Sequence, residues 1–155
     1  MFSQALIAQN YNFSVVSPSG HTLYYRIDNT FSSPSVIVCP PTTKSAYEES
    51  WEFTPYPFDM SDVYPAPTGS LIIPNTVSWG GTLYSVAGID SYAFSKCTGL
   101  TSVTLPNNLI FIGIYAFYNC TLLSSINIPN TVQHIYTFAF ANCYSLTTIS
   151  LPNSL

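Results

Sequence analysis

The chain has 155 residues and a formal net charge of −4; hydrophobic residues make up 47% of it and charged residues only 6%. This length suffices for one domain with a substantial core, or for a short repeat array with a cap, but not for two independent enzymatic domains. Three basic residues provide no cationic patch for phosphates, which argues against nucleic acid and anionic membranes as partners. No apolar run reaches the roughly 18 residues of a membrane-spanning helix.

The first ten residues contain a short apolar patch at positions 5–8 without a basic start. This pattern fits the end of a secretory signal whose beginning is missing, or a disordered leader. The first alternative predicts an exported protein that is extracellular or attached to the cell surface.

Residues 11–70 are predicted to form an N-terminal β cap. Residues 11–27 read as two strands around a turn at 18–20, and residues 35–39 as a third strand. Residues 40–69 are rich in proline and hold most of the acidic side chains, which predicts a long irregular acidic loop. The loop's carboxylates leave a Ca²⁺ site or a paired-carboxylate hydrolase site as alternatives, although their spacing fits no EF-hand. These carboxylates belong to Glu48, Glu49, Glu52, Asp59 and Asp62.

Residues 71–155 repeat themselves, as the even spacing of Cys97, Cys120 and Cys143 shows. The period of about 23 residues lies in the range of leucine-rich repeats, about 20 to 29 residues. Side chains of a strand alternate between its faces, so LTSVTLP, LSSINIP and LTTISLP each predict one short parallel strand, ended by proline. The predicted outward residues are candidates for a binding face: Ser102, Thr104, Ser125, Asn127, Thr148 and Ser150.

The first repeat carries a nine-residue insertion, in which Gly80 and Gly81 predict a tight hairpin turn. The last predicted strand, residues 147–151, would present an unpaired edge. Two alternatives follow: the chain is a piece of a longer array, or another chain, such as a second copy, pairs with this edge.

The unit LPNNLIFIGIYAFYNCTLLSSINIP resembles the BspA-like leucine-rich repeat of surface proteins from Bacteroidales, in its proline, its Ala-Phe pair and the Cys three residues later. The resemblance is strong over 71–155 and weak over 11–39. It implies a mainly β leucine-rich repeat solenoid behind an N-terminal β-hairpin cap, on a cell-surface or secreted protein of a family associated with adhesion. It brings no catalytic residue and no cofactor. Asp90 and Tyr136 depart from the pattern, because they stand where the middle unit has Gly113.

The three repeat cysteines are predicted to be buried free thiols that pack as small hydrophobic side chains. Disulfides between successive coils and a metal site are the alternatives, although ligands spaced one repeat apart in a line do not converge on zinc. Cys39 stands alone. His21 and His134 have no acidic partner nearby in the sequence, so no catalytic triad is predicted.

Three aromatic residues share one repeat position before the Ala-Phe pair: Tyr92, Tyr115 and Phe138. Phe111 and His134 form a second, partly aligned pair. Such rings either shield the coil or, beside hydroxyl and amide groups, bind sugars or peptides.

These patterns favour a non-enzymatic module that binds a protein or glycan on host or microbial cells, through the outward strand residues or the aromatic residues. A structural cap or spacer, or a self-associating unit without its own ligand, is the second hypothesis. A carbohydrate-active enzyme that uses the acidic loop is the third.

Overall fold

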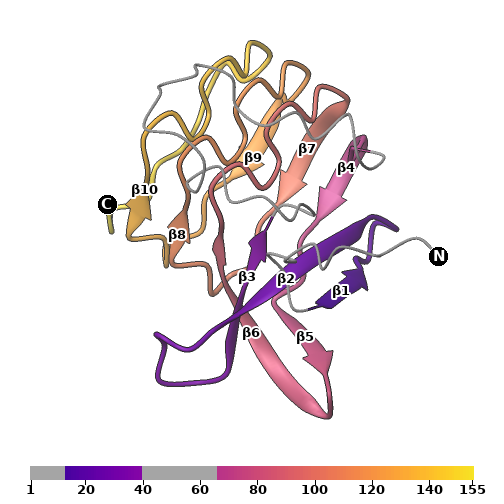
Figure 1. Cartoon of the computed structure of the whole chain (residues 1–155). Helices are drawn as coiled ribbons and strands as arrows, with labels where there is room; N and C mark the ends of the chain where they lie inside the picture. Colours follow the sequence, from indigo (N-terminus) through magenta and orange to yellow (C-terminus); the bar gives the residue numbers. More distant parts are fainter. Residues whose placement is uncertain (1–12, 40–65) are drawn as a thin grey trace, which may run out of the picture.

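A computed structural model describes residues 13–39 and 66–155, which contain strands and turns but no helix (Figure 1). The strands are β1 (Phe13–Val16), β2 (Thr22–Asp28), β3 (Ser35–Cys39), β4 (Gly69–Ile72), β5 (Thr76–Trp79), β6 (Thr82–Ile89), β7 (Leu100–Thr104), β8 (Phe111–Ile112), β9 (Ser125–Asn127) and β10 (His134–Ile135). They form a seven-stranded sheet in the order β1-β2-β3-β6-β8-β10, with β5 also paired to β6, and a three-stranded sheet in the order β4-β7-β9. The predicted acidic loop falls almost entirely on residues 40–65, outside the described residues.

Strands β1, β2 and β3 form an antiparallel meander at the N-terminal side. The β1–β2 turn closes with a hydrogen bond from the Ser17 amide to the His21 carbonyl, 2.7 Å, and another from the Gly20 amide to the Ser17 carbonyl, 2.9 Å. Gly20 has a φ of 85°, which glycine adopts without steric strain. The turn therefore lies where the sequence predicted it.

Strand β6 connects this meander to the repeats. Its first half pairs antiparallel with β5 across Gly80 and Gly81, whose φ values of 57° and 79° suit the tight turn of a two-residue hairpin. Its second half pairs parallel with β3 on one side and with β8 on the other. A single strand thus belongs to both the cap and the first coil.

Three successive coils each contribute to two parallel ladders, where the sequence predicted one strand per repeat. In the three-stranded sheet, Ser102 pairs with Ser125; in the seven-stranded sheet, Ile112 pairs with Ile135. The partners in both pairs are one repeat apart in the sequence. The second ladder was missed because β8 and β10 have two residues each, too few for an alternating pattern. A further prediction was wrong: residues 147–151 form no strand.

A row of turns closes the third side of each coil, and its backbone amides alternate between two kinds of acceptor. Ala93, Ser95 and Cys97 donate to carbonyls three residues back in the same coil, over 3.1–3.3 Å. The amides between them donate to the next coil, so that Phe94 reaches the carbonyl of Ala116 at 2.8 Å. Stacking the coils therefore satisfies backbone groups that no single turn could satisfy alone.

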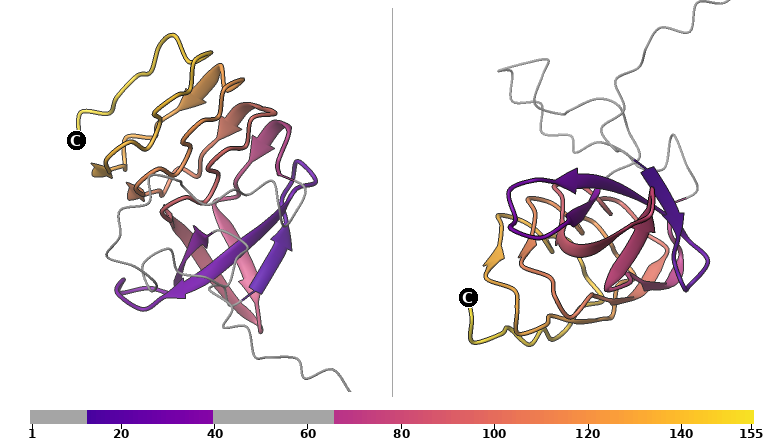
Figure 2. Two further views of the ribbon diagram at one scale, coloured as in Figure 1. Left: turned by 45° about the horizontal axis from the view of Figure 1, so that its top comes forward. Right: turned by 90° about the horizontal axis from the view of Figure 1, so that it is seen from below.

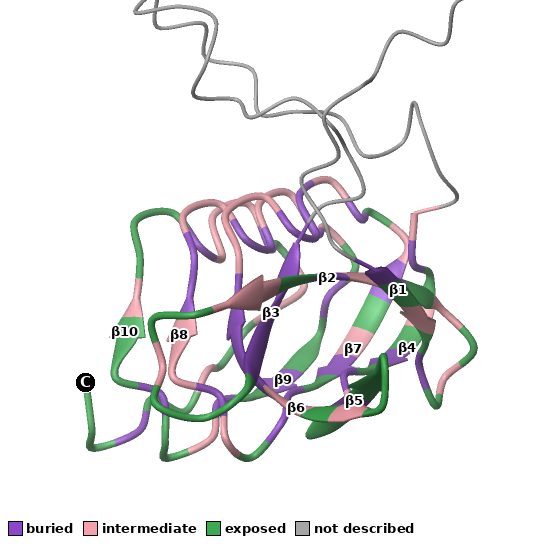
Figure 3. Cartoon of the chain, turned by 60° about the horizontal axis from the view of Figure 1, so that its bottom comes forward, coloured by how far each residue is buried: buried purple, intermediate pink, exposed green. Residues whose placement is uncertain are grey.

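Buried positions recur from coil to coil (Figure 3). Their side chains form one hydrophobic core that runs through the coils. Phe94 stacks on Phe117 with ring centroids 5.1 Å apart, and Phe117 stacks on Phe140 at 5.4 Å. The alanine before each phenylalanine is buried, because the backbone turns tightly there. Gly113 is required at its place: a Cβ atom on it would lie 2.5 Å from the Ser91 nitrogen.

Candidate binding surface

The three-stranded sheet presents one face to solvent and the other to the core. Its inward row is Leu71, Val103 and Ile126, which are paired in register and buried. The alternate residues must then point outward. We call these outward residues the strand face: Ser70, Ile72, Ser102, Thr104, Ser125 and Asn127.

The strand face consists of two rows that cross all three strands. In the first row, Ser70 pairs with Ser102 and Ser102 with Ser125. In the second row, Ile72 pairs with Thr104 and Thr104 with Asn127. The Ser102 hydroxyl donates to the Ser70 hydroxyl at 2.9 Å. Ser102 is half-buried and the others are exposed, so the rows offer hydroxyl and amide groups on a flat sheet surface.

Four of the six predicted outward residues are thus brought together on this face. Thr148 and Ser150 are exposed as well, but no strand forms around them, so they do not extend the rows as part of the sheet. In return the structure adds Ser70 and Ile72, which the sequence analysis missed because it did not expect β4 to be the first strand of this sheet. The alternation in residues 69–73, with buried Leu71 and Ile73, was the available signal.

The aromatic stripe, formed by Tyr92, Tyr115 and Phe138, is a continuous ring stack. The centroids of Tyr92 and Tyr115 are 5.3 Å apart, and those of Tyr115 and Phe138 are 5.1 Å apart, with nearly parallel planes. Tyr118 packs edge-on against Tyr115. Both faces of the Tyr115 ring are therefore covered by its neighbours in the stack, whereas Phe138 at the end of the stack is exposed.

The backbone under this stack is left-handed. Tyr92, Tyr115 and Phe138 have φ values of 61°, 54° and 59°, which are uncommon for residues other than glycine. Lys96, Asn119 and Asn142, four positions further on, share this conformation, with φ values of 60°, 59° and 62°. Ring stacking and the hydrogen bonds between coils must offset the strain. The asparagines were the signal in the sequence, because Asn tolerates this region better than most residues.

Phe111 and His134 face each other across the β8–β10 ladder, as their alignment predicted. The Phe111 ring lies over Gly88, where a Cβ atom would come within 2.3 Å of it. Tyr136 meets Phe111 edge-on and lies 6.0 Å from the His134 ring. This group forms a smaller aromatic patch on the outer face of the seven-stranded sheet.

All four cysteines are buried free thiols, which confirms the prediction made for the three repeat cysteines. The Cys120 thiol donates to the Phe94 carbonyl and the Cys143 thiol to the Phe117 carbonyl, both at 3.1 Å. Burial raises the pKa of Cys97 to about 12; burial, with the nearby Asp90 carboxylate, raises the pKa of Cys39 to about 12. Contact with Cys143 and burial hold the pKa of Cys120 above its usual range. The thiols of Cys39, Cys97 and Cys120 therefore stay protonated at neutral pH and are packing groups rather than nucleophiles.

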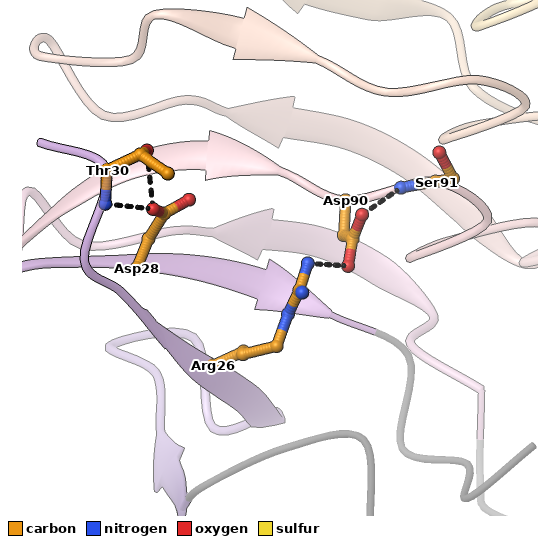
Figure 4. A network of polar contacts seen from close by, with 5 residues as sticks. All are labelled: Arg26, Asp28, Thr30, Asp90 and Ser91. Carbon is orange, nitrogen blue, oxygen red and sulfur yellow. Dashed lines mark hydrogen bonds and ion pairs between the residues drawn. The ribbon is translucent and has the colours of Figure 1, made fainter. Parts of the chain in front are cut away.

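Polar contacts connect the cap to the first coil (Figure 4). Arg26 on β2 donates through Nη2 to Oδ2 of Asp90 at 2.8 Å, and the other Asp90 oxygen accepts the Ser91 amide at 2.8 Å. Asp28 accepts two hydrogen bonds from Thr30 at the end of β2. Asp90, a departure from the repeat pattern, therefore has a structural use at the junction between cap and array.

Within residues 13–39 and 66–155, no three His, Cys, Asp or Glu side chains gather into a group that would hold a metal ion. His21 lies in the β1–β2 turn and His134 on β10, at opposite ends of the seven-stranded sheet. The predicted carboxylate alternatives, Glu48, Glu49, Glu52, Asp59 and Asp62, lie outside the described residues. In the described part of the chain, no helix is long and apolar enough to cross a membrane.

Comparison with known proteins identifies the repeats. Residues 82–155 match the family described as BspA type leucine rich repeat region, in six copies. The search of curated proteins found no match.

Three solved structures share the fold. A leucine-rich repeat protein from Bacteroides ovatus is 25% identical, with a TM-score of 0.66 over 94% of this chain and 30% of that one. One from Bacteroides capillosus is 25% identical, with a TM-score of 0.65 over 93% of this chain and 86% of that one. A leucine rich cell surface protein from Faecalibacterium prausnitzii is 20% identical, with a TM-score of 0.54 over 94% and 38%.

The chain thus spans less than a third of the Bacteroides ovatus protein but most of the Bacteroides capillosus protein. The family match covers the same coils that carry the stacked phenylalanines, the thiols and the two ladders. Residues 82–155 are therefore similar to the leucine-rich repeat region of the BspA type, and the described part of the chain has the leucine-rich repeat fold.

Proposed function

We propose that the protein is a non-enzymatic binding module that holds a protein or glycan partner on the strand face. The observation that carries this proposal is the pair of in-register outward rows on the three-stranded sheet, polar except for Ile72, above a buried apolar row. Solenoids commonly bind partners through such extended sheet surfaces. Leucine-rich repeat proteins generally serve as binding or scaffold modules, which supports the assignment.

The near absence of charged side chains in the repeats favours an uncharged partner. Among residues 71–155 only Asp90 and Lys96 carry a full charge, and neither belongs to the strand face. A strongly charged partner would lose hydration there without gaining an opposite charge, which is unfavourable. A partner that offers hydroxyl and amide groups, such as a neutral glycan or an uncharged protein surface, fits the rows best.

Three observations support an extracellular or cell-surface location for this activity. The apolar patch at residues 5–8 fits a secretory leader, the chain has only 6% charged residues, and the Faecalibacterium neighbour is described as a cell surface protein. The four thiols do not contradict export, because each is buried. Adhesion to host or microbial cells is the role that follows.

An array of neutral and anionic glycans together with extracellular-matrix proteins tests the proposal. The variant replaces the predicted set with alanine: Ser102, Thr104, Ser125, Asn127, Thr148 and Ser150. We expect the wild-type protein to bind at least one neutral probe and the variant to lose most of that signal. A matched control replaces Thr76 and Ser78, exposed residues of β5 on a different surface, and is expected to bind like the wild type.

Binding should change little when sodium chloride is raised, because few ionic contacts are involved. Full binding by the six-residue variant would remove the strand face from consideration. If loss of binding instead followed Phe138→Ala, the outer end of the aromatic stripe would be the site. If no probe bound and light scattering gave a stable dimer, the structural alternative would replace this proposal.

A further inference from the structure

Strand β4 is an edge strand of the three-stranded sheet. Among the described residues its outer edge pairs with no strand, and the β1–β2 turn contacts it instead. Gly69 and Ile73 donate their amides toward the neighbouring strand, to Gly99 at 2.8 Å and Thr104 at 3.0 Å. Amides alternate in direction along a strand, so the Ile72 amide points to the opposite edge. Edges of this kind are templates for pairing with another chain.

Two side chains of the β1–β2 turn occupy this outer edge. The Ile72 amide donates to the Ser19 hydroxyl at 2.9 Å, and the Thr68 carbonyl lies 2.9 Å from Nε2 of His21. Both partners are distant in the sequence, so tertiary structure alone brings them together. The turn and β4 lie side by side in Figure 1.

The hydrogen-bond directions in this contact follow from its chemistry. A carbonyl oxygen only accepts, so Nε2 of His21 carries the proton. In the neutral imidazole, Nδ1 is then an acceptor, and it lies 2.9 Å from the Ser19 hydroxyl. The Ser19 hydrogen goes to His21, which leaves its oxygen lone pairs for the Ile72 amide. Ser17 braces the pair, because its hydroxyl lies 2.9 Å from that of Ser19 and accepts the His21 amide at 3.2 Å.

The segment at the start of β4 is also held from the other side. A Cβ atom on Gly99 would lie 2.7 Å from Cγ2 of Thr68, so the residue before β7 approaches Thr68 as closely as a glycine permits. Thr68 therefore contacts Gly99 on one side and His21 on the other. These two contacts hold the start of β4 in place.

We propose that Ser19 and His21 form an edge clasp, which blocks strand addition at the N-terminal edge of the three-stranded sheet. The clasp takes one donor of β4, the Ile72 amide, and the carbonyl of Thr68 directly before β4, which are groups that a further strand would pair with. Without it, the strand that fits this edge is β4 of a second copy, because the two edges are identical and residues 66–72 carry no charge that would repel a copy. The inference concerns closure of the array and does not rest on the proposed binding function.

Hydrogen exchange of the Ile72 amide in the full chain tests the clasp directly. We expect Ser19→Ala to raise its exchange rate about five- to tenfold, the change that loss of one hydrogen bond produces. Ser19→Thr, which keeps the hydroxyl, should leave the rate close to wild type. Ser14→Ala, an exposed serine on β1, serves as the matched control and should change nothing at Ile72.

Light scattering over a range of concentrations tests the second part. We expect the double variant S19A/H21A to associate at concentrations where the wild type and the control variant H134A keep their original mass. Exchange at Ile72 should become slower again as the variant associates, because a second copy then covers the edge.

Three results would overturn the inference. An Ile72 amide equally protected in Ser19→Ala and wild type would show that the hydroxyl does not cover it. An unchanged mass of the double variant would show that the clasp does not prevent association. Loss of protection throughout the chain, instead of a change confined to β4, would mean that the turn is needed for folding and not for guarding an edge.

Discussion

The cap strands β1 to β3 lie beside the stacked coils (Figure 2). Both regions contribute to one hydrophobic core, but with different kinds of contact. In the cap each contact occurs once: Phe13 stacks on Trp79 at 4.8 Å, Arg26 pairs with Asp90, and His21 reaches Thr68. In the coils the same contacts return with every repeat, as in the phenylalanine stack and the thiol-to-carbonyl hydrogen bonds.

This difference decides how each region responds to change. Repeat proteins gain stability from each unit and from each interface between neighbouring units. The loss of stability caused by a substitution in a coil should therefore depend on how many neighbouring coils the replaced side chain contacts. The loss of stability caused by a substitution in the cap should depend only on the one contact that the replaced side chain makes. The predictions below test this distinction, from the largest expected effect to the smallest.

The largest effect is expected for Phe117→Ala, in the middle of the phenylalanine stack. The ring is fully buried and packs against a phenyl ring on each side, so its removal should lower the free energy of unfolding by about 3–5 kcal/mol. Phe140→Ala, which removes a half-buried ring with one stacked neighbour, should cost about half as much. Urea denaturation measures both. Equal losses would show that stability does not depend on the number of neighbouring coils.

Alkaline pH should weaken the fold through the buried thiols. Burial raises the pKa of Cys39 and of Cys97 from 9.0 to about 12, so the folded state holds these protons more tightly than the unfolded state. The stabilisation is complete below pH 9 and is lost as the pH rises from there towards 12. The loss should be about 1.4 kcal/mol per thiol for each pH unit.

The urea midpoint of the wild type should therefore fall steeply above pH 9. The double variant C39A/C97A should show a shallower fall, although it starts from a lower stability at neutral pH. Parallel pH profiles for the two proteins would contradict the assignment to these thiols.

Gly113→Ala should destabilise the array through a clash between coils. The added Cβ atom would meet backbone atoms of Asp90 and Ser91, which cannot move aside, so we expect a loss of about 1–3 kcal/mol. Gly80→Ala is the matched control in the β5–β6 turn, where nothing lies within 4 Å and only the φ of 57° is unfavourable. It should lose about 1 kcal/mol in thermal or urea unfolding. A smaller loss at Gly113 than at Gly80 would argue against close contact of the coils.

The smallest effect is expected for Arg26→Ala, which removes the ion pair to Asp90. Nη2 and Oδ2 are 2.8 Å apart, but the arginine side chain is half exposed, so water screens the attraction. We expect a loss of about 0.2–1 kcal/mol at low salt, and a smaller loss in about 1 M sodium chloride. A loss above about 2 kcal/mol, unchanged by salt, would show that packing of the arginine stem dominates this junction.

The strand face was largely predictable because burial follows the two-residue period of a strand. Ser102, Thr104, Ser125 and Asn127 were placed outward on that basis, and they lie outward. Residues 148 and 150 show the same pattern but lie in no strand, because a pattern states which side chains would be buried and not whether a ladder forms. Ser70 was missed for the opposite reason: its strand precedes a nine-residue insertion that hid the period.

The sequence by itself determined the length of each coil, the inward column of Phe, Ala and Cys, and the hairpin at Gly80 and Gly81. Each of these follows from local chemistry: alternation of apolar residues, the size of a side chain, or the φ that glycine permits. Tertiary structure alone decided the second ladder, the left-handed tyrosines of the aromatic stripe and the hydrogen bonds from Ser19 and His21 to β4. These features need an acceptor or a ring that arrives from another coil or from a distant part of the sequence, and no local pattern records which partner that will be.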